Sequence, residues 1–249
     1  MNTNLKLLAA FALGGGLSWA AATQGVLPTA ASGVGEDKIK EIVRQVIQDE
    51  PKLIIDSVQN MQNAERQQKV AKASEALKDD TIRLALFNNS NSPFIGRADS
   101  EKTVVEFFDY NCPACKMQFK ALEELHAANP EIKIIFKEFP IFGEVSDKNS
   151  AIGLAVHRVA PEKYFEFHTK MMTAEGRVDE AATLEIVKAL GIDVEKIKAE
   201  AAKQEVKDIL TSYRELGNKL HVQGTPTLVI GDEVVPNAAS KEDILAKLK

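Results

Sequence analysis

The chain has 249 residues, of which 45% are hydrophobic and 27% are charged. This composition is typical of a soluble globular protein with one sizeable domain and room for an accessory segment. The formal net charge is −5, with lysine and arginine spread along the whole sequence, so there is no basic patch. The composition therefore argues against a nucleic-acid partner, whose phosphates require clustered positive charge.

Residues 1–22 follow the three-part pattern of a secretory signal peptide. Lys6 supplies a positive charge, residues 7–22 are uncharged and mostly apolar, and residues 20–22 are alanines that offer an A-x-A cleavage site. A membrane anchor is the alternative, but a spanning helix needs about 20 apolar residues and this run is shorter. We expect cleavage and a periplasmic location, with membrane association if the segment is retained. An oxidising compartment suits a working cysteine pair.

Two segments precede the main domain. Residues 23–35 are small and rich in Gly, Ala and Thr, which predicts a flexible linker. Residues 36–87 have the spacing of two amphipathic helices, the second beginning at Pro51 as a first-turn proline. The apolar stripe consists of Ile39, Ile42, Val43, Val46 and Ile47, then Ile54, Val58 and Met61. This helical stalk either packs against the main domain as a hairpin or associates with an identical chain.

The main domain begins with a strand, a helix and a second strand. Residues 88–102 are turn-rich, and we place the domain boundary near residue 100. β-branched and aromatic residues predict strands at 103–109 and 131–139. Between them, residues 112–129 have helical spacing.

The second half of the domain is helical before it returns to strands. The pattern at 146–220 is almost wholly helical, and Gly231-Asp232 then separates short strands at 228–230 and 233–235 as a hairpin. A capping box at 240–243 starts a terminal helix. The sequence therefore predicts an α/β, thioredoxin-like fold that carries an inserted helical domain and follows an N-terminal helical stalk.

The two cysteines of the chain, Cys112 and Cys115, lie two residues apart at the start of the predicted 112–129 helix. Unpaired backbone amides and the positive end of the helix dipole favour a thiolate at Cys112. Pro113 suits the first helical turn. Cys115 lies nearly one turn deeper on the same face, where it can close a disulfide with Cys112. The pair thus has the attacking and resolving thiols that thiol–disulfide exchange requires.

Other roles for the cysteine pair are weaker. Two cysteines supply half of a tetrahedral zinc site and no histidine neighbours them, so we expect neither a metal nor a cofactor, although a site shared between subunits stays open. A structural disulfide across so short a loop restricts the unfolded chain little. Four histidines lack ligand spacing and are interpreted as surface or core residues: His126, His157, His168 and His221. C-x-x-C between a strand and a helix favours redox chemistry.

A second element is the stretch VQGTPTLVIG, in which Thr225-Pro226 directly precedes a predicted strand. A cis proline here exposes the backbone of Thr225, which can then pair with an extended substrate strand beside Cys112. An ordinary trans turn is the alternative that X-Pro statistics favour.

Three separated motifs, VVEFFDYNCPAC, FKEFPIFG and GTPTLVIG, resemble the DsbA-like branch of the thioredoxin superfamily over residues 100–249. The helical segment before them is similar to the stalks of ScsC-type proteins, which join subunits into dimers or trimers. The resemblance implies that Cys112 is the nucleophile, Cys115 the resolving cysteine and Pro226 a cis-proline preceded by Thr225. It also implies a homo-oligomer with a membrane redox partner.

The resemblance also assigns a role to Glu106, which lies on the strand before Cys112. DsbA-like proteins place a buried acid there, able to exchange a proton with the resolving Cys115. An exposed glutamate is the alternative, but the apolar neighbours Val105 and Phe107 favour burial. Lys137 is a candidate ion-pair partner for this acid.

Two departures from the DsbA pattern bear on function. The dipeptide between the cysteines is Pro-Ala instead of Pro-His, which removes a cation near the thiolate and predicts a less oxidising couple. The residue before the proposed cis-proline is Thr225, which resembles the pattern of the DsbC and DsbG isomerases, whereas DsbA-type oxidases carry Val at this position. We therefore favour an isomerase or reductase acting on unfolded or misfolded, cysteine-containing secreted proteins. A DsbA-type oxidase is the close alternative, and a chaperone-like or copper-binding dithiol module is a third.

Overall fold

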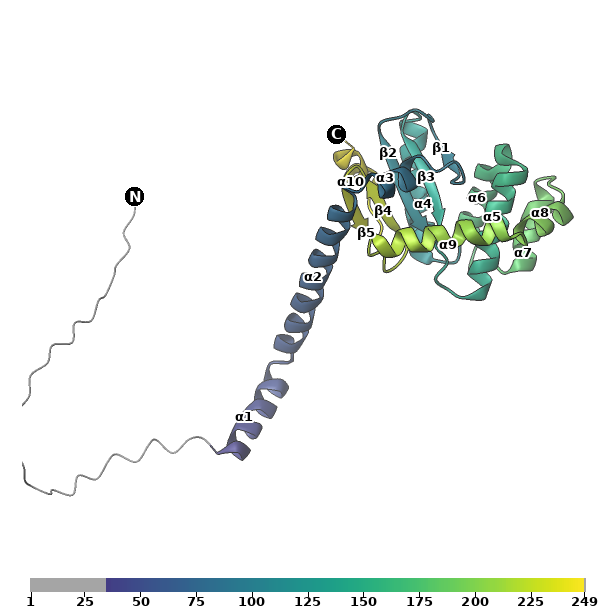
Figure 1. The fold of residues 1–249 in the computed structure, drawn as a ribbon. Coiled ribbons are helices and arrows are strands. Elements are labelled where there is room, and N and C mark those ends of the chain that lie inside the picture. The colour runs from purple at the N-terminus through teal and green to yellow at the C-terminus, as the bar shows by residue number, and fades with distance from the viewer. Residues whose placement is uncertain (1–34, 249) are drawn as a thin grey trace, which may run out of the picture. The chain divides into compact units, whose positions relative to one another are not determined.

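The computed structural model describes residues 35–248. The expected signal peptide at 1–22, and all but the last residue of the expected linker at 23–35, lie outside the described residues. The chain divides into two units, Met1–Val58 and Gln59–Lys249 (Figure 1). In the part of the chain that the structure describes, no helix combines the length and the apolar character needed to span a membrane.

The first unit contains α1 (Glu36–Asp49) and the beginning of α2 (Pro51–Ala76). Pro51 is the first residue of α2, as its missing N–H allows. No residue of α1 is buried, and its five apolar side chains, Ile39, Ile42, Val43, Val46 and Ile47, are each 43–50% exposed. The predicted amphipathic helices are therefore present, and their apolar stripe lies open in the single chain.

The second unit is built on a five-stranded sheet of order β1-β3-β2-β4-β5 (Figure 1). The strand pair β2–β3 is parallel and the other three pairs are antiparallel. The strands are β1 (Phe94–Ile95), β2 (Thr103–Phe108), β3 (Lys133–Glu138), β4 (Thr227–Ile230) and β5 (Glu233–Pro236). The sequence predicted all of these except β1, which is two residues long and lies inside the turn-rich segment 88–102.

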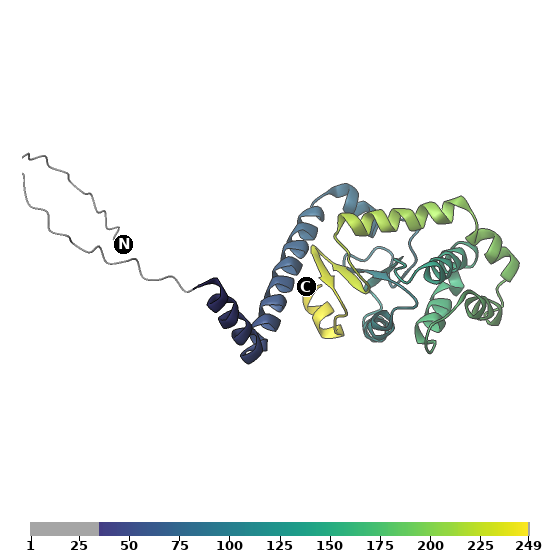
Figure 2. The same cartoon turned by 90° about the horizontal axis from the view of Figure 1, so that it is seen from below.

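Helices cover both faces of this sheet. Successive side chains of a strand point to opposite sides, so the apolar residues of β2 form a core on each face. On one face, Val104 and Phe108 pack in a core with residues of α4 (Pro113–Ala128) and α10 (Lys241–Lys247). On the other face, Val105 and Phe107 pack with the end of α2, with α3 (Asp80–Phe87) and with α9 (Gln204–Lys219). Figure 2 shows α9 on one side of the strands and the yellow α10 on the other. The result is a three-layer α/β arrangement.

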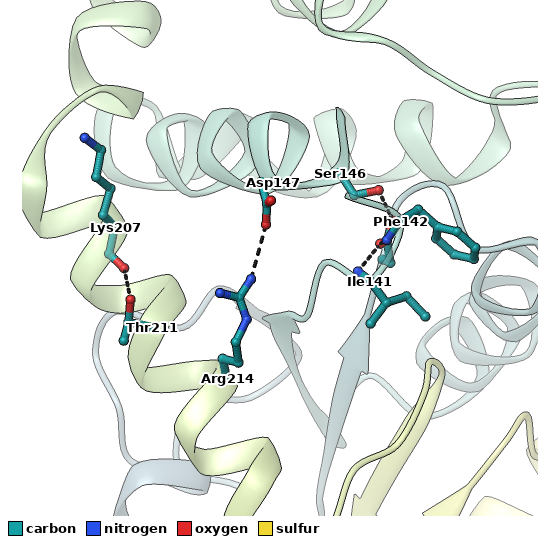
Figure 3. A network of polar contacts seen from close by, with 8 residues as sticks. Ile141, Phe142, Ser146, Asp147, Lys207, Thr211 and Arg214 are labelled. Atoms are coloured by element: carbon teal, nitrogen blue, oxygen red, sulfur yellow. Dashed lines mark hydrogen bonds and ion pairs between the residues drawn. The ribbon is translucent and has the colours of Figure 1, made fainter. Parts of the chain in front are cut away.

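A block of helices lies between β3 and β4, as the sequence predicted. A short core joins its first and last helices through Leu154, Val206, Ile209 and Tyr213. Asp147 of the first helix also pairs with Arg214 of the last at 3.2 Å (Figure 3). The block comprises α5 (Glu144–Val159), a 3-10 turn (Pro161–Lys163), α6 (Tyr164–Thr173), α7 (Glu180–Ala189), α8 (Val194–Ala201) and α9.

Candidate active site

Cys112 caps the N-terminus of α4, directly after the turn that follows β2. Its backbone N–H donates to the Asp109 carbonyl at 3.0 Å, and its own carbonyl accepts from the Lys116 amide at 3.1 Å in the first helical turn. Pro113 occupies the first position of the helix. The unpaired amides of this turn therefore face the Cys112 side chain, as the sequence predicted.

The carboxylate of Asp109 holds this turn in place through hydrogen bonds. It accepts hydrogen bonds from the Asn111 amide at 2.8 Å, the Ile141 amide at 2.7 Å and the Ser146 hydroxyl at 2.8 Å. The last two groups come from the loop after β3 and from the start of α5, and Figure 3 labels both residues. Asp109 thus ties the cysteine turn to the helical block. This role was not predicted from the sequence, although an acid directly after a buried strand is a usable signal.

The two sulfurs lie in different surroundings. Both cysteines are free thiols, and Cys112 retains 4% of its exposure whereas Cys115 has none. The Cys112 thiol donates to the carbonyl of Thr225 at 3.2 Å. The Thr225-Pro226 bond is cis, as the resemblance implied. Segments more than a hundred residues apart in the sequence therefore meet at one sulfur.

Hydrogen bonds lower the pKa of the Cys112 thiol to about 5. The largest contribution comes from Cys115, and the Thr225 side chain and the amides of Cys115 and Ala114 add to it, against the opposing effect of burial. In the thiol form the Thr225 hydroxyl has no hydrogen-bond partner within residues 35–248, so it is available to the thiolate. With this pKa, about 99% of Cys112 is ionised at pH 7, against about 3% of an ordinary thiol.

Burial opposes a negative charge on both Cys115 and Glu106. Burial raises the pKa of Cys115, and its hydrogen bond to Cys112 and the charge of Glu106 raise it further. Burial also raises the pKa of Glu106 well above its usual value, with the Cys112 charge adding to the effect. Glu106 is fully buried, and neither of its carboxyl oxygens has a hydrogen-bond partner within the described residues. The expected burial of this acid is confirmed.

A model of the DSBA-like thioredoxin domain matches residues 103–249, which is more than half of the chain. The chain belongs to this family. The cysteine turn and the cis Thr225-Pro226 bond both lie within the matched residues.

Known proteins agree with this assignment. Disulfide bond formation protein D of Bacillus subtilis is 28% identical over 162 residues, covering 61% of this chain and 73% of that protein. A thioredoxin-like oxidoreductase from Silicibacter pomeroyi is 33% identical with a TM-score of 0.64, covering 67% of this chain and 95% of that one. Proteus mirabilis ScsC in a transitional conformation is 28% identical with a TM-score of 0.63, covering 86% and 96%. The DsbA-like protein described here is a thiol–disulfide oxidoreductase.

Lys137 does not pair with Glu106, and that expectation is wrong. In the parallel register Glu106 lies opposite Phe136, whereas Lys137 lies opposite Phe107, so the acid and the lysine point to opposite faces of the sheet. The Lys137 ammonium instead donates to the Ala85 carbonyl at 2.9 Å and to the Ser92 hydroxyl at 2.8 Å. Lys137 therefore does not supply a positive charge on the face of the sheet that carries Glu106.

A buried polar cluster lies beside the cysteine turn and was also missed. The Nδ1 atom of His168 is 3.4 Å from the Tyr110 hydroxyl and 3.5 Å from the Tyr164 hydroxyl, which in turn donates to Glu138 at 3.4 Å. Gly153 allows this approach, because a Cβ there would meet the Tyr110 hydroxyl at 2.8 Å. Burial lowers the pKa of His168 to about 3 and raises that of Glu138 to about 8, so both side chains are largely neutral at pH 7.

One large cavity of the second unit lies away from the sulfur. Its volume is about 750 Å³, and it is lined by Thr103 and Lys133 at the starts of β2 and β3. Cys112 follows the other end of β2, so cavity and sulfur lie at opposite ends of the strand. Within residues 35–248 there is no cluster of three or more His, Cys, Asp or Glu side chains placed to hold a metal ion.

Replacing Glu106 by leucine should stabilise the protein, because the buried carboxyl lacks hydrogen-bond partners. We expect the free energy of unfolding to rise by about 1–3 kcal/mol. The gain should be smallest at pH 4, where the carboxyl is mostly protonated in the unfolded chain as well, and should grow toward pH 8. Over that range the unfolded chain releases a proton that the folded chain keeps. Denaturant unfolding of both proteins at several pH values measures this difference.

The matched control is Glu123→Leu, because Glu123 is exposed on the same unit in helix α4 and its carboxyl stays in solvent. A gain for Glu106→Leu that does not change between pH 4 and pH 8 would contradict a carboxyl held neutral by burial.

Proposed function

We propose that this oxidoreductase corrects wrong disulfides in unfolded or misfolded secreted proteins in the periplasm, by isomerisation or reduction. In this proposal Cys112 is the nucleophile, Cys115 the resolving cysteine and Glu106 the group that exchanges a proton with it. Thr225 and Pro226 hold the substrate strand. The observation that carries the proposal is the position of the Cys112 sulfur, 3.2 Å from the Thr225 carbonyl of the cis-proline loop, in surroundings that lower its pKa to about 5.

The first step is attack by the Cys112 thiolate on one sulfur of a substrate disulfide. A bond forms between this sulfur and Sγ of Cys112 while the substrate S–S bond breaks, and the second substrate sulfur leaves as a thiolate. For isomerisation, a substrate thiolate attacks another substrate disulfide and a substrate thiolate finally displaces Cys112. No net electrons are transferred, and the enzyme ends as it began.

Reduction requires Cys115. Its thiol gives up a proton and its sulfur attacks Sγ of Cys112, which releases the substrate as a thiolate and leaves a Cys112–Cys115 disulfide. In the mixed disulfide Cys112 carries no charge, which removes one of the two causes that raise the pKa of Glu106, so in this proposal a Glu106 carboxylate forms at this stage and takes that proton. A dithiol reductant must then return two electrons to the pair, and we assign this to a membrane redox partner.

The acidity of Cys112 supports the correction of wrong disulfides over the net oxidation of substrate thiols. A pKa of about 5 lies between that of the strong oxidant DsbA, about 3.5, and that of thioredoxin, about 7. A thiolate of intermediate acidity predicts an intermediate reduction potential, because the reduced form is stabilised less than in DsbA. Pro-Ala between the cysteines and Thr225 before the cis-proline support the same reading.

Oxidation is the second candidate, and a specific observation favours it. The curated relative from Bacillus subtilis is called a disulfide bond formation protein. In this case the same residues carry out the reduction described above in reverse. A preformed Cys112–Cys115 disulfide accepts two electrons from two substrate thiols, which become a substrate disulfide.

We further propose that α1 and the start of α2 join copies of this chain into a dimer or trimer. Five apolar side chains of α1 are 43–50% exposed in the single chain, and burial of such a stripe against its own copies removes it from water. The likeness to ScsC in a transitional conformation covers 86% of this chain, well beyond the DSBA-like domain, and supports a shared stalk. A paired site lets one subunit hold a substrate while another reacts.

For the catalytic proposal, we expect the protein to restore activity to scrambled ribonuclease, with a reduction potential near that of protein disulfide isomerase, about −180 mV. Cys112→Ser should abolish both isomerisation and insulin reduction. Cys115→Ala should lose insulin reduction but keep part of the isomerisation, because a substrate thiol can still displace Cys112.

A potential near −120 mV with no ribonuclease recovery would favour the oxidase. Suppression of aggregation that survives Cys112→Ser, in a protein without exchange activity, would favour a chaperone-like holder. Copper bound to the purified reduced protein would favour the metal-binding module.

For the oligomer, we expect the protein without residues 1–22 to be a dimer or trimer in solution, and deletion of residues 36–58, which leaves the second unit intact, to give a monomer. Ile42→Glu should weaken assembly because it places a charge in the apolar stripe, whereas Arg44→Glu on the opposite side of α1 should not. Light scattering after size-exclusion chromatography measures the masses. A monomer before any deletion would overturn the assembly and weaken the preference for isomerisation.

A further inference from the structure

A second cavity lies directly beside the cis-proline loop. Its volume is about 340 Å³, and it lies wholly within the unit Gln59–Lys249. One wall is the last part of α2, including Arg66 and Lys69, and the opposite wall is the loop that carries Gln223 and Thr225. The cavity thus combines the helix that precedes the domain with the loop that touches the reactive sulfur.

The cavity shares one residue, Thr225, with the active site. This residue lines the cavity, and its carbonyl is also the acceptor for the Cys112 thiol at 3.2 Å. Asn237 lines the cavity too and fixes the loop, because its amide donates to the Pro226 carbonyl at 3.0 Å. An extended chain advances about 3.3 Å per residue, so a polypeptide bonded to Cys112 reaches past Thr225 within two to four residues.

The helix wall is positively charged. Arg66 and Lys69 are neighbours on one face of α2, being three residues apart. Lys69 donates to the neutral side chain of Gln223 at 2.8 Å, which anchors the helix to the loop without cancelling the charge. Arg66 has no ion pair within residues 35–248, and Glu65 is the one acid among the residues that line the cavity. A local excess of positive charge therefore faces this cavity on a chain whose net charge is −5.

We propose that this cavity binds the substrate segment next to the reactive cysteine and selects segments that carry an aspartate or glutamate there. The inference rests on the proposed function, since it names which polypeptides the site prefers. The apolar lining residues Val70, Val222 and Val234 accept the aliphatic part of the segment, while Arg66 and Lys69 pair with its carboxylate. The end of α2 then acts in substrate binding in addition to any role of the helix in assembly.

The test uses synthetic peptides with one cysteine held as a mixed disulfide with thionitrobenzoate, whose release is coloured. The peptides differ only by Asp, Asn or Lys at one position, two to four residues from the cysteine on either side. We expect the full-length reduced protein to react with the best-placed Asp peptide about three to ten times faster than with its Lys counterpart, in low salt. The same comparison in high salt should show a smaller ratio.

Arg66→Glu should reverse this preference. Lys72→Glu is the matched control: it makes the same change of charge on the same helix, but Lys72 is exposed and does not line the cavity. Reduction of the neutral hydroxyethyl disulfide should proceed equally in all three proteins, which separates loss of the binding site from loss of the redox chemistry.

Equal rates for the Asp and Lys peptides, or a preference that Lys72→Glu alters as much as Arg66→Glu does, would overturn the proposed subsite. Loss of the reaction with hydroxyethyl disulfide in the unmodified protein would instead overturn the proposed function.

Discussion

Hydrogen bonds at the start of α4 hold a negative charge on the sulfur of Cys112, and the rest of the site depends on that charge. Three acidic groups, Cys112, Cys115 and Glu106, are close enough for the charge of one to affect the pKa of another. Burial allows only one of them to ionise readily. Each further negative charge is opposed by the first. Cys112 takes the charge because it alone has donors from Cys115, Thr225 and the first-turn amides.

The fold brings those donors together from distant parts of the chain. Strand β2 ends just before the cysteine turn, and its antiparallel partner β4 begins just after Pro226. The two loops therefore lie side by side at the same ends of these neighbouring strands. Asp109 then ties the cysteine turn to the helical block through Ile141 and Ser146. The difference between an ionised Cys112 and a neutral Cys115, one helical turn apart, follows from this placement.

Local sequence signals predicted what local physics decides. The C-x-x-C spacing at a helix start, the strands around it and the helical block could be predicted, because periodicity and helix-terminus electrostatics act over a few residues. Pairing across the sheet could not. Lys137 was expected beside Glu106, but the register of β2 against β3 places it on the other face. The second cavity was also missed, since nothing in the polar end of α2 indicates that it lies against the loop before β4.

The acidity of Cys112 is the most direct test of this account. Cys112 is the only cysteine of the pair with any exposure, so the rate at which iodoacetamide alkylates the reduced native protein, followed against pH, reports its ionisation. The account predicts a single titration with a midpoint at about pH 5. A midpoint near 8.5, the value of an ordinary free thiol, would contradict it.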